Sequence, residues 1–139
     1  MNKYPISIII IFFIISTIVF LAIFIINWKR LAKLYRTNQP APHNLLRMRN
    51  GYIGLIYYKA TLNVGITSEG IYLSIFPLFS FGSPPVLIPW QAIARIESAN
   101  RLFVQRYRLY LNSPKMRIIL DKEDLQPAKD FLATRGIDI

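Results

Sequence analysis

The first pattern along the chain is an uninterrupted apolar run from Ile6 to Ile26. It contains no charged residue, glycine or proline, and its only polar side chains are hydroxyls that can bond back to helix carbonyls. About 21 residues at about 1.5 Å per residue make a helix of about 31 Å, which matches the hydrocarbon thickness of a bilayer. No face of this helix is polar, as a soluble helix would require. The pattern predicts a transmembrane anchor over residues 1–27.

A basic and aromatic segment follows the anchor and keeps the helical spacing. Aromatic side chains suit the headgroup layer and cations suit an anionic leaflet, so this segment is predicted to lie at the membrane interface. The predicted membrane-interface anchors are Trp28, Lys29, Arg30, Lys33, Tyr35 and Arg36. An ordinary stop-transfer collar and a dedicated lipid-recognition site both fit this composition. Two prolines between Thr37 and Asn44 then stiffen the chain, so residues 28–44 are predicted as a basic collar and linker.

From Leu45 the hydrophobic period changes to two, which predicts a mainly-β domain over residues 45–139. A hairpin is expected between 62–66 and 71–75, with Gly70 in the left-handed position of its turn. The predicted strands lie at residues 52–58, 60–67, 70–76, 85–89, 92–98, 103–112 and 115–120. Residues 76–85 are rich in proline and glycine and are expected to form a loop.

The register of the last hairpin follows from the same pattern, with Ser113 and Pro114 at its tip. The pairs on one face are then all apolar: Leu111 with Met116, Leu109 with Ile118, and Tyr107 with Leu120. The pairs on the other face are Tyr110 with Arg117, Arg108 with Ile119, and Arg106 with Asp121. A slip of one residue would bury arginines, so this register is predicted for the hairpin.

The chain ends in an amphipathic segment from Asp121 to Arg135 that predicts one closing helix. Asp121 is expected to cap its start, and Leu125, Ala128 and Leu132 form its apolar stripe. Pro127 is compatible with this helix only if the regular part begins there. The fold class predicted is therefore an N-terminal transmembrane helix plus a mainly-β (α+β) domain of about seven strands closed by one C-terminal helix.

Charge adds a functional indication to this picture. The net charge is +10, and of the 17 lysines and arginines only Lys3 precedes the anchor, which leaves sixteen against 7 acidic residues beyond it. A domain this basic is attracted to anionic surfaces. The candidate anionic-ligand face consists of Arg106, Arg108, Tyr110 and Arg117 on the last hairpin, with Arg47 and Arg49 nearby. A merely solvated sheet face is the alternative, and nucleic acid is the least supported partner because the aromatic residues fit a core better than a stacking ladder.

The residues needed for catalysis are not grouped by the sequence. The chain has no cysteine and a single histidine, His43, which lies in the linker, so the usual zinc sites are excluded. The carboxylates fall mainly in a predicted helix start and in tight turns, where capping explains them. We therefore expect no enzyme activity, no metal and no cofactor.

The arrangement of elements resembles a pleckstrin-homology-like domain. The segments Gly70-Ile71-Tyr72-Leu73-Ser74 and Pro84-Pro85-Val86-Leu87-Ile88-Pro89-Trp90-Gln91-Ala92-Ile93 are similar to those of small, largely uncharacterised single-pass bacterial membrane proteins with such a domain. The resemblance implies a β-sandwich or open barrel with a binding role and offers no catalytic residues.

The flanks of the anchor predict its orientation. Four cations follow it and Lys3 alone precedes it, so the positive-inside rule places the C-terminal domain in the cytoplasm at the inner (plasma) membrane. A cleaved signal peptide is the alternative, against which stand the length of the run and the bulky, charged residues that end it. We expect a non-catalytic, membrane-anchored interaction module that binds a protein partner or anionic lipid. The alternative is an accessory or structural subunit of a larger membrane protein complex.

Overall fold

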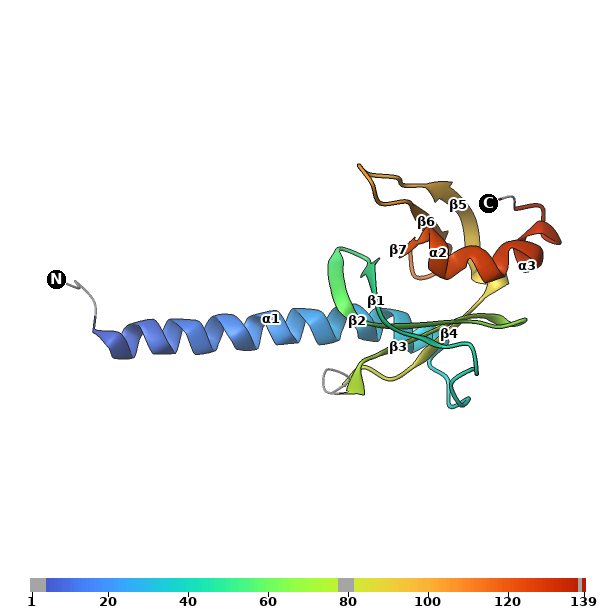
Figure 1. Ribbon diagram of the computed structural model, residues 1–139. Coiled ribbons are helices and arrows are strands. Elements are labelled where there is room, and N and C mark those ends of the chain that lie inside the picture. The colour runs from blue at the N-terminus through green and yellow to red at the C-terminus, as the bar shows by residue number, and fades with distance from the viewer. Residues whose placement is uncertain (1–4, 78–81, 138) are drawn as a thin grey trace.

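The computed structural model describes residues 5–77, 82–137 and 139. A long N-terminal helix leads into a β domain with short helices at its C-terminal end (Figure 1), which confirms the predicted fold class. The elements are α1 (Ile6–Tyr35), β1 (Leu46–Ile53), β2 (Ile56–Ile66), β3 (Gly70–Ile75), β4 (Val86–Pro89), η2 (Trp90–Ala92), β5 (Ile93–Ser98), β6 (Arg106–Leu111), β7 (Met116–Asp121), α2 (Lys122–Leu125), η3 (Gln126–Ala128) and α3 (Lys129–Ala133).

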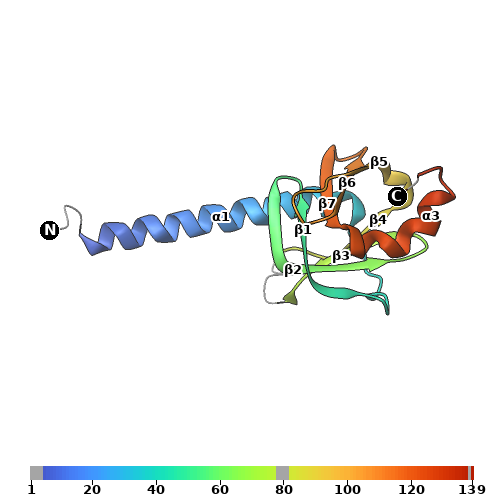
Figure 2. The same cartoon turned by 45° about the horizontal axis from the view of Figure 1, so that its top comes forward.

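Helix α1 is a single element of 30 residues. Its most apolar stretch has no buried side chain, and it is long and apolar enough to cross a membrane. The helix does not stop at the end of that stretch but continues through the basic segment to Tyr35, as the helical spacing there predicts. Figures 1 and 2 show its N-terminal part projecting away from the β domain and its C-terminal part lying against it.

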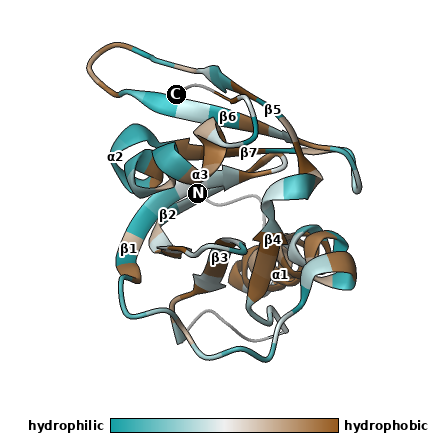
Figure 3. Ribbon diagram, turned by 90° about the vertical axis from the view of Figure 1, so that its right-hand side faces the viewer, coloured by the Kyte–Doolittle hydropathy of each residue, from teal (hydrophilic) through white to brown (hydrophobic). Residues whose placement is uncertain are grey.

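The seven strands form one antiparallel sheet in the order β4-β3-β2-β1-β7-β6-β5. The sheet bends so that β5, β6 and β7 lie over the β1–β4 part (Figure 3). The C-terminal end of α1 lies beside β4, where Arg36 and Val86 form an isolated β-bridge. Apolar side chains from both parts of the sheet, from α1 and from the C-terminal helices fill one common core.

The predicted register of the β6–β7 hairpin and the predicted β2–β3 hairpin are both confirmed. In the β6–β7 hairpin all six predicted pairs occur, from Arg106 with Asp121 to Leu111 with Met116. In the β2–β3 hairpin Leu62 pairs with Ile75 and Ile66 with Ile71. The reason given for Gly70 is wrong, because the described glycines with positive φ are Gly54, Gly82 and Gly136. Glycine is required at position 70 because a Cβ there would collide with the carbonyl oxygen of Ile88 on β4.

The first two predicted strands are placed wrongly. Residues predicted as separate strands at 52–58 and 60–67 form the end of β1 and nearly all of β2, and β1 itself begins at Leu46. The turn between them is at Gly54, whose φ of 61° is a left-handed conformation that favours glycine. The sequence pattern missed this turn because a single Gly-Leu pair gives only a weak turn signal.

The closing helix is interrupted where Pro127 stands. Residues 126–128 form a 3₁₀ turn between α2 and α3, because proline cannot donate the backbone hydrogen bond that a continuous helix needs. The predicted apolar stripe is confirmed, since Leu125, Ala128 and Leu132 are fully buried. Asp121 occupies the N-cap position but makes no side-chain cap hydrogen bond; its carboxylate lies 3.4 Å from Nε of Arg106 instead.

The folded unit begins earlier than the predicted boundary at residue 45. Trp28 and Leu31 of α1 are fully buried and belong to the core of the β domain. The prediction that Trp28 lies among lipid headgroups is therefore wrong, because a side chain with no exposed surface cannot contact lipid. The linker also packs on the domain, since the amide of Thr37 donates to the carbonyl of Pro85 and the side chain of Asn44 to that of Ile66.

Candidate functional site

The outer face of β6 and β7 carries the arginines that were predicted to bind an anion, but two of them, Arg106 and Arg108, already form ion pairs within the chain. The carboxylate of Glu97 on β5 accepts a hydrogen bond of 3.1 Å from the hydroxyl of Tyr110 and lies 3.8 Å from Arg108. Arg95 adds a second ion pair to Glu97 at 3.4 Å and stacks over the ring of Tyr110. The predicted face is therefore a mixed network of cations and carboxylates.

Arg106 is neutralised in the same way by Asp121, which lies opposite it across the β6–β7 ladder. Its guanidinium also lies about 6 Å from the rings of Tyr52 and Tyr57. Arg117 is exposed and, within the described part of the chain, makes no ion pair. One free cation on this face is weak support for an anion site.

The two remaining predicted arginines lie in β1 and serve different environments. Arg49 contacts the buried Asp124, with its Nη2 2.6 Å and its Nε 2.8 Å from the same carboxylate oxygen, so it fastens the C-terminal helices to the sheet. Burial raises the pKa of Asp124, and the hydrogen bonds from Arg49 oppose that rise. The net effect is a raised pKa, since the second carboxylate oxygen of Asp124 is buried without a hydrogen-bond partner among the described residues. Arg47 is exposed and lines a cavity of about 360 Å³ whose wall also includes Ser83 and Pro84.

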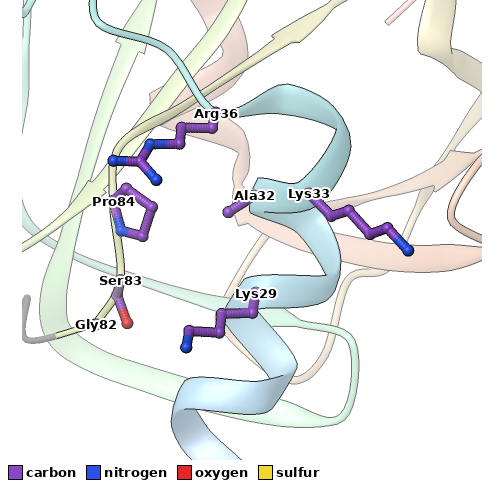
Figure 4. Close-up of a pocket in the computed structure, with 7 residues that line it drawn as sticks. All are labelled: Lys29, Ala32, Lys33, Arg36, Gly82, Ser83 and Pro84. Carbon is purple, nitrogen blue, oxygen red and sulfur yellow. The ribbon is translucent and has the colours of Figure 1, made fainter.

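The structure instead forms a basic groove where α1 enters the β domain. The groove has a volume of about 830 Å³, and we call it the α1 groove (Figure 4). It is lined by Lys29, Ala32, Lys33 and Arg36 of α1 and by Gly82, Ser83 and Pro84 of the segment that precedes β4. Three of the predicted membrane-interface anchors thus line one concave surface.

Two of these cations face the opposite wall of the groove. Lys29 and Arg36 extend from the helix toward residues 82–84, whereas the amine of Lys33 points away (Figure 4). Neither Lys29 nor Arg36 forms an ion pair with any carboxylate in the described residues. Their charges are therefore available to an external anion, unlike those of Arg49, Arg106 and Arg108.

The opposite wall is held in place by contacts with α1. The indole nitrogen of Trp28 donates a hydrogen bond of 2.6 Å to the carbonyl oxygen of Pro84. Gly82, with a φ of 70°, lies beside Ile25, and an added Cβ would be in ordinary van der Waals contact with its side chain at 3.4 Å. Ser83, between them, is only 3% exposed, and its hydroxyl has no hydrogen-bond partner among the described residues.

Exposed apolar side chains form a second unusual feature. The loop between β5 and β6 reaches back toward the side from which α1 enters (Figure 1), and it carries Leu102 at 94% and Phe103 at 100% exposure. Leu55 in the β1–β2 turn is 84% exposed. That turn lies beside the anchor, since the side chain of Asn27 donates to the carbonyl of Ile53 at 2.7 Å.

In the described residues no group of three or more His, Asp and Glu side chains could hold a metal ion. Sequence reasoning singled out the helix cations but missed Ser83, because nothing local indicates that residues 82–84 pack against a helix more than fifty positions earlier.

No protein-family model matches the chain, and no curated protein matches it. The function is therefore inferred from the residues of this chain.

Proposed function

We propose that this is a single-pass protein of the inner (plasma) membrane whose cytoplasmic β domain is a non-catalytic interaction module held against the membrane surface. The observation that carries the proposal is the continuity of α1. The same helix supplies an apolar span whose most apolar stretch has no buried side chain and, at its other end, two fully buried core residues, Trp28 and Leu31. A domain fixed in this way cannot swing freely on a linker.

The orientation rests on the distribution of charge. Lys29, Arg30, Lys33 and Arg36 are all exposed and follow the apolar span, whereas one lysine precedes it in the sequence. Positive charges are retained on the cytoplasmic side during insertion. The same charges favour an anionic leaflet, which makes anionic lipid the partner with the most support.

The pleckstrin-homology-like identity of the domain belongs to this proposal. An antiparallel sheet of seven strands followed by C-terminal helices supports it. The β1–β2 turn is short, and the groove that we favour as the binding site lies at α1 and not at this turn.

A second candidate is an accessory subunit of a membrane protein complex. The observation that favours it is the fully exposed Leu102-Phe103 pair, because large apolar side chains at a loop tip commonly mark a contact with a partner or a membrane. The position of this loop tip relative to the bilayer distinguishes the two candidates.

The orientation can be tested on the full chain in cells, because the absence of cysteine allows single labelling sites. Lys59→Cys and Lys129→Cys replace exposed residues on β2 and α3. A membrane-impermeant maleimide added to intact cells should leave both unlabelled, and permeabilisation should expose both. Labelling of both positions in intact cells would overturn the proposed orientation.

A further inference from the structure

We propose that the α1 groove binds the phosphate of an anionic phospholipid headgroup, with Lys29, Arg36 and Ser83 as its ligands. This inference rests on the proposed membrane anchoring and assigns it a specific site. It replaces the outer face of the last hairpin, where carboxylates already neutralise two of the arginines.

The charge of the groove is concentrated by the fold. Positions 29 and 36 are two helical turns apart on one side of α1, so their side chains frame a single space about 10 Å long. Both point into that space, and no carboxylate of the described residues competes for them (Figure 4). Ala32, nearly buried between them, leaves room for a ligand at the floor.

Ser83 distinguishes a binding site from a simple collar of positive charge. The cations alone could be explained by a stop-transfer collar, and Lys33 also complements the helix dipole in the last turn. Neither explanation accounts for a buried hydroxyl. Buried polar groups normally have a hydrogen-bond partner, and the hydroxyl of Ser83 has none in the described part of the protein. A phosphate oxygen in the groove would accept its proton.

The position of the groove along the axis of α1, relative to the end of the apolar run, identifies the source of the phosphate. Gly82 packs against Ile25, one residue before the apolar run ends, and Lys29 lies about 6 Å farther along the helix axis than Ile25. The headgroup layer on each side of a bilayer is about 5–7 Å thick. The groove therefore begins where lipid phosphates are most concentrated, and a membrane lipid is favoured over a dissolved phosphate.

Native mass spectrometry of the full chain in a neutral detergent tests the proposal. The probes are phosphatidylglycerol, which is anionic, phosphatidylcholine, which is zwitterionic, and soluble glycerol phosphate. We expect the protein to retain phosphatidylglycerol at least tenfold more strongly than either of the others. Equal retention of the two lipids, or equal affinity for glycerol phosphate, would overturn the lipid assignment.

Ser83→Ala is the decisive variant. It should weaken phosphatidylglycerol binding about tenfold, because a hydrogen bond to a charged group is lost. It should leave the thermal midpoint of the unliganded protein unchanged or raised, because the hydroxyl has no partner to lose. A variant that binds phosphatidylglycerol like the unmodified protein would overturn the role of Ser83.

Matched charge variants separate the groove from the collar. Lys29→Gln and Arg36→Gln should each weaken binding about fivefold, whereas Arg30→Gln removes an equal charge from the same helix outside the groove and should change binding less than twofold. Equal losses from Arg30→Gln and Lys29→Gln, with none from Ser83→Ala, would leave only a diffuse basic collar. That result would overturn the proposal that the α1 groove binds lipid. The proposed orientation would still be decided separately, by the maleimide labelling of the domain.

Discussion

The indole nitrogen of Trp28 and the carbonyl oxygen of Pro84 are 2.6 Å apart and join the anchor helix to the segment before β4. Around this bond Trp28 packs edge-on to the ring of Tyr58, which itself lies 4.7 Å from Phe24. Burial at this junction raises the pKa of Tyr58 to about 12, so its hydroxyl stays protonated at neutral pH. The junction is thus an extension of the domain core onto the helix.

Replacement of Trp28 should therefore destabilise the β domain. We expect Trp28→Ala to lower the free energy of unfolding by about 3–5 kcal/mol, because a large buried side chain leaves a cavity. Denaturant unfolding of the full chain in detergent micelles, followed by the fluorescence of Trp90, measures this. Leu34→Ala is the control: Leu34 is exposed on the same helix, so its replacement should change the free energy by less than about 0.5 kcal/mol. Equal effects would show that the helix is not part of the domain.

The hairpin of β6 and β7 gives a second test, since its two faces alternate between core and surface. Leu109→Ala should lower the free energy of unfolding by about 2–5 kcal/mol, because Leu109 is buried opposite Ile118. Arg108→Ala, on the outer face, should lower it by at most about 1 kcal/mol, because its ion pair with Glu97 is partly exposed. The reverse order of the two effects in the same unfolding assay would contradict the observed register.

How much of this fold the sequence could predict depends on how local each signal is. The β6–β7 register was predictable because every slip exposes apolar side chains or buries arginine, and the apolar span was predictable from its length. The β1–β2 turn was not predictable, because the single glycine Gly54 is a weak turn signal and because nothing in the sequence indicates the positive φ of Ala60. The pairing of Arg106 with Asp121 was predicted as a register, yet its consequence for the anion site was missed. The α1 groove depends on contacts between residues 28 and 84, which no local pattern reveals.

Arg49 and Asp124 allow the buried ion pair to be examined directly. Arg49→Met should lower the free energy of unfolding by about 3–5 kcal/mol at neutral pH, because it leaves a buried carboxylate without its partner. The double variant Arg49→Met/Asp124→Leu should recover most of this loss, since apolar replacements of a buried pair are often tolerated. A double variant as unstable as Arg49→Met would contradict the explanation by an unpaired charge.

The raised pKa of Asp124 predicts the pH dependence of stability. Because the folded state holds the proton more tightly than the unfolded state, whose pKa is near the ordinary 3.8, this group favours folding most at pH values below that figure. Its contribution is lost as the pH rises through the folded-state pKa. Asp124→Asn cannot ionise, so its free energy of unfolding relative to the unmodified protein should increase from pH 4 to pH 7 in denaturant titrations. A difference that decreases over this range would show that Arg49 lowers the pKa below its ordinary value.

The tip of the β5–β6 loop provides the last test, because it separates the membrane-surface proposal from the complex-subunit alternative. Leu102 has a φ of 53°, a backbone conformation that glycine adopts with less strain, so turn geometry does not explain a leucine there. If the tip enters the bilayer interface, an environment-sensitive dye on Phe103→Cys should emit at shorter wavelength in lipid nanodiscs than the same dye on Lys129→Cys. Leu102→Ser, added to the labelled Phe103→Cys chain, should reduce that difference and change the free energy of unfolding by less than about 0.5 kcal/mol, because its side chain is almost fully exposed. Equal emission from the two dye positions in nanodiscs would place the tip in water and favour a protein partner for it.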